Sequence, residues 1–299
     1  MPSISRVSVI GAGTMGAGIA QVCAQAGFAV KLIDVKEEFA RKGLATINSS
    51  LDRMVKKETI TEEQKKEITG RVRTDVGVDG ASGSDLVIEA INENLELKTS
   101  VLKEAAKSAG ENAILATNTS SISITKIAAV TKRPESVIGM HFMNPVPLMK
   151  LVEIITGYAT SQAVTDSIVA LTNQLGKTPC VVSDYPGFIA NRILMPMINE
   201  AIYSLYEGVA GVAAIDTVMK LGMAHPMGPL QLADFIGLDV CFSILKVLQD
   251  GFGNPKYAPC PLLVNMVTAG KLGVKSGEGF YMYTAGSKDL VVSERFVEV

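Results

Sequence analysis

The stretch VSVIGAGTMGAG, residues 7–18, decides the fold of this 299-residue chain. Its Gly11, Gly13 and Gly16 have the G-x-G-x-x-G spacing, which is a weak signal by itself. Here the glycines follow a short apolar run at residues 6–10 and open a helical stretch at residues 14–26. Asp34 ends the next predicted strand. A strand, a glycine loop, a helix and a terminal acid in this order predict a dinucleotide-binding βαβ unit.

Each residue of this fingerprint has a physical role. Gly11 permits the tight turn, Gly13 lets a pyrophosphate approach the backbone, and Gly16 lets the helix and the strand pack closely. Asp34 would accept hydrogen bonds from ribose hydroxyls and repel a 2′-phosphate, so NAD is favoured over NADP. Lys36 lies two residues further on, so NADP stays an alternative cofactor. A glycine turn that binds no ligand is the alternative interpretation.

The first half of the chain continues to alternate between strand and helix. Strands are predicted at residues 28–34, 85–91, 113–119, 136–142, 150–156 and 178–184, and helices at 37–59, from 61 and at 161–176. This alternation indicates a parallel sheet with both faces covered. The short loop before residues 150–156 suits an antiparallel return, because a parallel crossover needs about a dozen residues. The expected fold class is α/β, with a Rossmann-type, doubly wound, mostly parallel sheet.

The character of the sequence changes near Asp184. From there we expect almost only helix, beginning with a long apolar helix over residues 187–208 that Pro196 should kink. Further helices are predicted at residues 213–222, 228–250 and 261–270. We therefore expect an NAD-binding Rossmann domain at residues 1–183. An all-helical C-terminal domain, expected to form a wall of the substrate cleft and a dimer surface, would follow at residues 184–299.

Composition and charge exclude several classes of function. Hydrophobic residues make up 47% of the chain and charged residues 19%, which predicts a well-cored soluble protein. A net charge of −2 without a basic run argues against nucleic-acid binding. Polar and charged residues interrupt every apolar run before it reaches membrane-spanning length, and the N-terminus has no signal-peptide pattern. The four cysteines are widely spaced, so no disulfide or metal site is expected and the cytoplasm fits best.

His141 ends a predicted strand in the stretch GMHFMNPVP, residues 139–147. A histidine on an apolar strand is more often a satisfied core residue than a catalyst. Ligands of open α/β sheets, however, bind beyond the carboxyl ends of the strands. If the chain folds back about Pro147, Glu153 on the next strand would face His141 and stabilise its imidazolium form. Such a pair suits the base that takes a proton from an alcohol during hydride removal, although Glu153 taken alone would be a solvated charge on an edge strand.

Six motifs together resemble the L-3-hydroxyacyl-CoA dehydrogenases, most of all the bacterial members that act on 3-hydroxybutyryl-CoA. They are VIGAGTMGAGIAQ (9–21), NTSSISIT (118–125), GMHFMNPVPLMKLVEII (139–155), DYPGFIANRI (184–193), MGPLQLADFIGLD (227–239) and GEGFY (277–281). The resemblance covers nearly the whole chain, and the HF-x-NPVP and PGF-x-x-NR patterns are highly specific. It implies NAD-dependent interconversion of a short L-3-hydroxyacyl-CoA and its 3-keto form, by a homodimer joined through the helical domain.

The resemblance also assigns roles to matching positions. His141 resembles the family's catalytic base and Glu153 its orienting partner, while Ser120 and Asn191 resemble the polar residues around the reacting oxygen and the imidazole. Without the resemblance, Ser120 would be a turn or N-cap serine and Asn191 an amide on a helix face. His225 matches no catalytic position of the family, and we expect it to be structural.

Further positions match residues that contact the cofactor or coenzyme A. The resemblance implies cofactor contacts for Glu93, Lys98, Ser120, Asn144 and Lys275, and coenzyme A contacts for Ser50, Lys57 and Ser120. The helix with Ser50 and Lys57 would otherwise be a solvated face, although its basic cluster suits an anionic carrier.

Other functions stay open at this point. A β-hydroxyacid dehydrogenase that acts on a free acid would share the glycine loop but use a catalytic lysine, and HFMNPVP argues against it. A relative that acts on a sugar acid would keep the His–Glu pair and would not need coenzyme A. A non-catalytic NAD-binding protein is a third alternative, which the intact set of polar residues disfavours. No motif has metal-ligand spacing, so no metal is expected.

Overall fold

The computed structural model describes residues 4–284, 286–287 and 289–297. The chain divides into two compact units, Met1–Tyr185 (unit 1) and Pro186–Val299 (unit 2). Each unit has its own hydrophobic core. Within the described residues, no helix is both long and apolar enough to cross a membrane.

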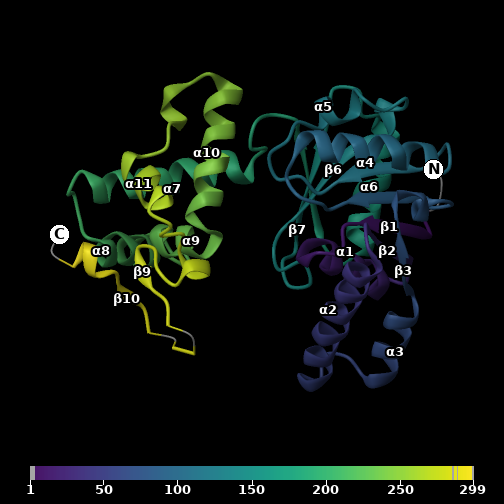
Figure 1. The fold of residues 1–299 in the computed structure, drawn as a ribbon, viewed down its shortest axis with the longest axis horizontal. Coiled ribbons are helices and arrows are strands. Elements are labelled where there is room, and N and C mark those ends of the chain that lie inside the picture. Colours follow the sequence, from purple (N-terminus) through teal and green to yellow (C-terminus); the bar gives the residue numbers. More distant parts are fainter. Residues whose placement is uncertain (1–3, 285, 288, 298–299) are drawn as a thin grey trace. The chain divides into compact units, whose positions relative to one another are not determined.

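Unit 1 is built on an eight-stranded sheet with the strand order β3-β2-β1-β4-β5-β6-β7-β8, with helices packed along it (Figure 1). The strands are β1 (Arg6–Ile10), β2 (Ala29–Asp34), β3 (Val72–Val76), β4 (Leu86–Glu89), β5 (Ile114–Thr117), β6 (Val137–Phe142), β7 (Leu151–Thr156) and β8 (Thr178–Ser183). The helices are α1 (Thr14–Gln25), α2 (Glu37–Lys56), α3 (Glu62–Gly70), α4 (Leu95–Ser108), α5 (Ile124–Ala128) and α6 (Gln162–Gln174). The predicted α/β class and mostly parallel sheet are confirmed.

The pairing of β6 with β7 reverses the direction of the sheet. The strands from β3 to β6 pair in parallel, whereas β6 and β7 are antiparallel and β8 is parallel to β7. The loop from β6 to β7 is too short for a parallel crossover, which confirms the predicted return. The register of this pair places His141 opposite Glu153.

The central strands are buried along their whole length. All residues of β4, β5 and β6 are buried, as expected for parallel strands covered on both faces. Three buried polar residues interrupt these apolar runs at or near the carboxyl ends of the strands: Glu89, Thr117 and His141. Ligands bind at this edge of open α/β sheets, so these residues locate the candidate site.

The edge strand β3 was not expected from the sequence. Its residues are VRTDV, and only Val72 is buried. Because β3 pairs on one side only, with β2, its sequence lacks the apolar run that marks the inner strands. The helix predicted from residue 61 starts with a capping box, in which Thr61 and Gln64 exchange side-chain and backbone hydrogen bonds at the start of α3.

Unit 2 is mostly helical. Its helices are α7 (Ala190–Tyr206), α8 (Val212–Thr217), α9 (Pro229–Ile236), α10 (Leu238–Phe252) and α11 (Pro261–Thr268). The single helix predicted over residues 228–250 was wrong, because Gly237 has φ +102° and separates α9 from α10. A two-stranded antiparallel sheet of β9 (Tyr281–Met282) and β10 (Val291–Val292) was also missed, because strands of two residues leave no periodic signal.

Candidate active site

The glycine loop lies between β1 and α1 and leaves no room for side chains at two positions. Gly11 has φ +101°, and a Cβ atom there would lie 2.6 Å from the Ala90 carbonyl oxygen. A Cβ atom at Gly16 would lie 1.7 Å from the Gly11 carbonyl oxygen, so helix and loop touch through backbone. A Cβ atom at Gly13, by contrast, would meet no atom within 4 Å. Open space beside a helix N-terminus fits the pyrophosphate of a dinucleotide.

Asp34 ends β2 beside this loop. Its Oδ2 accepts a hydrogen bond of 2.7 Å from the Ala12 amide, and its Oδ1 one of 2.7 Å from the Val35 amide. Two backbone donors therefore hold the carboxylate where a ribose would come. The Lys36 ammonium contacts neighbouring side chains of α2. It lies 3.5 Å from Glu38 and over the Phe39 ring.

His141 and Glu153 form a buried pair across β6 and β7. The distance from His141 Nδ1 to Glu153 Oε2 is 2.7 Å, and the residues are 8% and 2% exposed. Both are fixed by strand backbone, so the contact follows from the antiparallel register. A carboxylate at Nδ1 orients the ring and stabilises the imidazolium form when the ring takes a proton. The structure thus brings together the two residues that the sequence analysis selected as base and partner.

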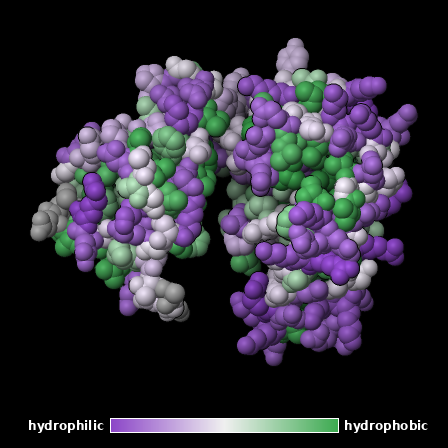
Figure 2. Space-filling model, in the orientation of Figure 1, coloured by the Kyte–Doolittle hydropathy of each residue, from purple (hydrophilic) through white to green (hydrophobic). Residues whose placement is uncertain are grey.

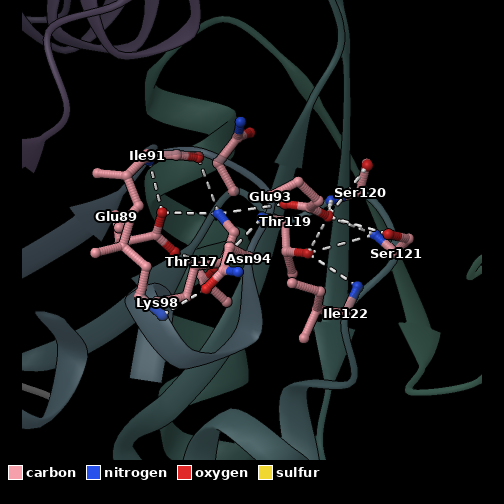
Figure 3. Close-up of polar contacts among 12 residues, drawn as sticks. Glu89, Ile91, Glu93, Asn94, Lys98, Thr117, Thr119, Ser120, Ser121 and Ile122 are labelled. Carbon is pink, nitrogen blue, oxygen red and sulfur yellow. Dashed lines mark hydrogen bonds and ion pairs between the residues drawn. The ribbon is translucent and has the colours of Figure 1, made fainter. Parts of the chain in front are cut away.

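Glu93, Lys98 and Ser120 meet in a second polar cluster (Figure 3). The Lys98 ammonium lies 2.8 Å from Glu89 Oε1 and 3.3 Å from Glu93 Oε2. Glu93 Oε1 accepts hydrogen bonds from the Thr119 hydroxyl at 2.5 Å and the Ser120 amide at 2.9 Å. Glu93, Lys98 and Ser120 are all residues predicted from the sequence to contact the cofactor, and the structure joins them through Glu93.

The charge of Glu93 is stabilised by its neighbours. Burial alone would raise the pKa of this carboxyl, but the Lys98 ammonium and hydrogen bonds from Thr119 and Ser120 outweigh burial and lower it. Glu93 is therefore ionised at neutral pH and acts as a fixed acceptor for the loop after β5.

The other predicted contact residues lie apart from these clusters in the chain. Asn144 is exposed in the loop after β6. Ser50 lies in the C-terminal half of α2, and Lys57 is the C-cap residue that follows this helix. The surface of unit 1 around α2 and α3 is hydrophilic in Figure 2, which agrees with a solvated face. Asn191 is buried on α7 of unit 2, and Lys275 forms an ion pair with Asp239 in the same unit.

Three buried residues of the polar cluster, Glu89, Thr117 and Thr119, were not selected from the sequence. Glu89, the last residue of β4, accepts hydrogen bonds from the Ile91 amide at 2.7 Å and from the Thr117 hydroxyl at 2.7 Å. A signal was present, because a carboxylate in the apolar run DLVIEAI is rarely buried unless it has a partner. The partner itself could not be identified, since Thr117 lies on another strand.

His225 and the cysteines have no part in these clusters. His225 is half-buried in unit 2, and its amide donates to the Met219 carbonyl. Cys23, Cys180, Cys241 and Cys260 are free thiols. Among the residues that the structure describes, no three His, Cys, Asp or Glu side chains gather as metal ligands would.

Comparison with known proteins decides the family. Residues 6–185 match the NAD binding domain of 3-hydroxyacyl-CoA dehydrogenase, and residues 187–283 match its C-terminal domain. The chain belongs to the 3-hydroxyacyl-CoA dehydrogenase family. Its members are oxidoreductases that act on CH–OH groups, so this chain is an NAD-dependent oxidoreductase. The family resemblance and the NAD cofactor predicted from the sequence are confirmed.

Relatives with this family's architecture cover nearly the whole chain. A 3-hydroxybutyryl-CoA dehydrogenase of Bradyrhizobium diazoefficiens is 54% identical over 280 residues, which are 94% of this chain and 96% of that protein. The human mitochondrial hydroxyacyl-coenzyme A dehydrogenase is 43% identical over 293 residues, covering 94% of this chain and 91% of that protein. The crystal structure of (S)-3-hydroxybutyryl-CoA dehydrogenase from Ralstonia eutropha superposes with a TM-score of 0.93 at 51% identity, covering 94% of this chain and 100% of that one.

Proposed function

We propose that this dehydrogenase interconverts L-3-hydroxybutyryl-CoA and acetoacetyl-CoA with NAD, using His141 as the base and Glu153 as its partner. The observation that carries the proposal is the 2.7 Å contact between the two side chains, next to the end of β6. The names of the two bacterial relatives support the substrate.

His141 moves the proton in the proposed mechanism. Because Nδ1 faces Glu153, the ring exchanges the proton of the substrate 3-hydroxyl through Nε2. Glu153 keeps the ring in one orientation and stabilises the imidazolium that results. The glycine loop and Asp34 would hold NAD, which would supply the acceptor for the hydride of the substrate. In the direction of reduction, the imidazolium returns its proton to the 3-keto oxygen.

Ser120 and Asn191 orient the reacting oxygen and the imidazole in this proposal. Ser120 is suited to a fixed position, because Glu93 accepts hydrogen bonds from its amide at 2.9 Å and its hydroxyl at 3.3 Å. Glu93, Lys98, Ser120, Asn144 and Lys275 would contact the cofactor. Ser50, Lys57 and Ser120 would contact coenzyme A.

The glycine loop and Asp34 determine the cofactor preference. Gly11, Gly13 and Gly16 would let the pyrophosphate approach the start of α1. Asp34 would accept hydrogen bonds from the ribose hydroxyls. The Asp34 carboxylate would repel a 2′-phosphate, and Lys36 is engaged with Glu38 rather than placed to bind one. We therefore propose a preference for NAD over NADP.

The second domain has proposed roles that follow from the family. Unit 2 would form a wall of the substrate cleft and join two copies of the chain in a homodimer. A cytoplasmic location, inferred from the cysteine pattern, stays a prediction.

A spectrophotometric assay tests the proposed reaction. NADH absorbance is followed after addition of acetoacetyl-CoA, with NADPH and with free acetoacetate in parallel reactions. We expect fast loss of absorbance with NADH and the thioester only. Equal rates with NADPH would contradict the role of Asp34, and equal rates with free acetoacetate would contradict the need for coenzyme A. No turnover with either cofactor would reject the reaction and favour a sugar-acid substrate or a non-catalytic role.

A further inference from the structure

Glu89 is a fully buried acid at the end of a strand that is otherwise apolar. It is 0% exposed, and its carboxylate contacts three separate segments. Oε1 accepts from the Ile91 amide at 2.7 Å and from the Lys98 ammonium at 2.8 Å, and Oε2 accepts from the Thr117 hydroxyl at 2.7 Å. These donors come from the segment after β4, from α4 and from β5. The carboxylate therefore has a single position, which the fold fixes.

Lys98 links this acid to Glu93. The lysine is 1% exposed, and its ammonium donates to Glu89 and to the Ile91 carbonyl at 3.2 Å. It also forms an ion pair with Glu93, whose Oε2 lies at 3.3 Å. Figure 3 shows the ammonium between the two carboxylates. The shorter contact is with Glu89, so Glu89 is the nearer of the two counter-charges of the buried ammonium. Glu93 is left with Oε1 directed elsewhere.

Glu93 Oε1 gathers the loop that follows β5. It accepts from the Thr119 hydroxyl, from the Ser120 amide at 2.9 Å and from the Ser121 amide at 3.1 Å. The Thr119 hydroxyl in turn accepts from the Ile122 amide at 2.9 Å. The backbone of residues 119–122 is thus folded around one carboxylate oxygen. The position of Ser120 depends on where that oxygen lies.

A second buried lysine in unit 1 shows that carboxylates are not required for burial alone. Lys177 is 8% exposed, and its ammonium donates to the Val146 and Met149 carbonyls, both at 2.7 Å. Backbone oxygens can therefore satisfy a buried ammonium in this fold. Two acids beside Lys98 call for a further explanation, and both lie at the edge of the sheet where ligands bind.

We propose that Glu89 is a positioning residue that acts through Lys98 and Glu93 on the placement of Ser120. An ionised Glu89 holds the Lys98 ammonium, so Glu93 remains available to the loop. Without the charge of Glu89, Lys98 draws Glu93 onto itself and the loop of residues 119–122 loses its acceptor. This inference rests on the proposed function, because the role of Ser120 at the reacting oxygen belongs to that proposal.

The Glu89→Gln variant tests the inference with little change in shape. The amide oxygen still accepts from Ile91 and Lys98, and the amide nitrogen can donate to Thr117, whose hydroxyl reverses its role. Two quantities are measured: NADH affinity by fluorescence titration, and kcat with acetoacetyl-CoA. Since a small misplacement of a catalytic group costs up to about 100-fold in rate, we expect kcat to fall about 10- to 100-fold. We expect the Kd of NADH to rise about tenfold, with Tm within about 3 °C of wild type.

Asn94→Ala is the matched control for a general loss of rigidity. Asn94 caps α4, the helix that carries Lys98, by accepting from the Leu97 amide at 2.8 Å. Its removal loosens the helix without changing the number of charges. We expect kcat and the Kd of NADH to stay within about twofold of wild type. An equal kinetic loss in Asn94→Ala would reduce Glu89 to a structural residue and overturn the proposal.

A double variant tests whether Glu89 acts through Glu93. If it does, Glu89→Gln combined with Glu93→Gln loses no more activity than Glu93→Gln alone, because both changes break one chain of contacts. Losses that multiply would overturn the proposal, and so would wild-type kcat and NADH affinity in Glu89→Gln.

The experiment also covers two other outcomes: a Glu89→Gln variant that does not fold, and a wild-type protein that lacks the proposed activity. If Glu89→Gln does not fold, Glu89→Asp keeps the charge but withdraws the carboxylate from Lys98. A fall in kcat with a rise in the Kd of NADH then supports the proposal, and wild-type values of both overturn it. If the wild-type protein does not reduce acetoacetyl-CoA, the proposed function fails, yet the NADH affinities still decide whether Glu89 positions the loop.

Discussion

Each unit of the protein holds a group of carboxylates in polar contacts, and the two groups are held differently. In unit 1 the acids contact basic side chains. Glu89 and Glu93 contact the Lys98 ammonium, and Glu153 contacts the His141 ring. In unit 2, neutral donors hold the buried pair Asp216 and Asp234. Asp216 accepts from the Leu230 amide and the Tyr281 hydroxyl, and Asp234 accepts from the Phe280 and Tyr281 amides and the Tyr283 hydroxyl.

This difference changes how the acids respond to pH. The Lys98 ammonium and nearby hydrogen bonds outweigh burial at Glu93 and lower its pKa. At Asp234, burial outweighs the hydrogen bonds, and with the nearby Asp216 charge it raises the pKa to about 6. The Glu93 carboxyl of unit 1 is therefore charged at neutral pH. In unit 2, Asp234 joins α9 to the segment with β9, and ionisation of its carboxyl as the pH rises through about 6 destabilises the folded state.

The largest effect should follow from removing the base in unit 1. In His141→Ala the ring that exchanges the substrate proton is lost, while the glycine loop and Asp34 are unchanged. General acid–base groups contribute about 10²- to 10⁴-fold, so we expect kcat for acetoacetyl-CoA reduction to fall by that factor. The Kd of NADH should stay within about twofold.

His225→Ala is the control for this variant, since His225 lies in unit 2 and is the second of the two histidines in the chain. It should keep wild-type kcat. Turnover of His141→Ala at the wild-type rate would show that unit 1 does not use this pair for chemistry.

The fold could be predicted from the sequence where the signal is local. The glycine loop, Asp34 and the alternation of strands and helices follow one another along the first half of the chain, so their order in the sequence predicts the fold. The His141–Glu153 pair was predictable because a short loop forces an antiparallel return and fixes the register. The edge strand β3 and the short strands β9 and β10 could not be recognised, because they pair on one side or are only two residues long.

The polar cluster could not be derived from spacing. Glu89, Lys98 and Thr117 meet only because β4 and β5 are neighbours and α4 packs beside them. The family resemblance predicted that Glu93 and Lys98 contact the cofactor. It did not predict a role for Glu89. A charged residue inside an apolar strand was the available signal, and its meaning depended on residues 9 and 28 positions away.

An intermediate effect should appear in the pH dependence of stability in unit 2. The pKa of Asp234 in the folded protein is about 6, above its ordinary value of 3.8. Because the folded state binds this proton more tightly, the stabilisation is present below about pH 4 and is lost as the pH rises through about 6. A shift of about two units corresponds to about 3 kcal/mol. Urea unfolding between pH 4 and 7.5 measures it as the difference between wild type and Asp234→Asn.

Asp234→Asn should be less stable than wild type over this whole pH range, because its amide N–H₂ takes the place of an oxygen that accepts hydrogen bonds. Its free energy of unfolding should not show the pH dependence that comes from ionisation of Asp234. Asp250→Asn is the control, since Asp250 is 73% exposed on its side chain and pairs only with the exposed Lys246 at 3.7 Å among its described ion pairs. Identical pH slopes for wild type and Asp234→Asn would remove the contrast between the two units.

The smallest effect should come from Glu153→Gln, which keeps the shape of the His141 pair and removes its charge. The amide oxygen can still accept from Nδ1, so the ring orientation and the fold are retained. The imidazolium loses its counter-charge, and we expect kcat to fall about 10- to 100-fold, less than in His141→Ala. Acetoacetyl-CoA reduction needs the protonated ring, so its rate profile should also move toward lower pH. An unfolded variant would make Glu153 a structural acid like Asp216, whereas an unchanged rate and pH profile would show that this carboxylate does not support the base.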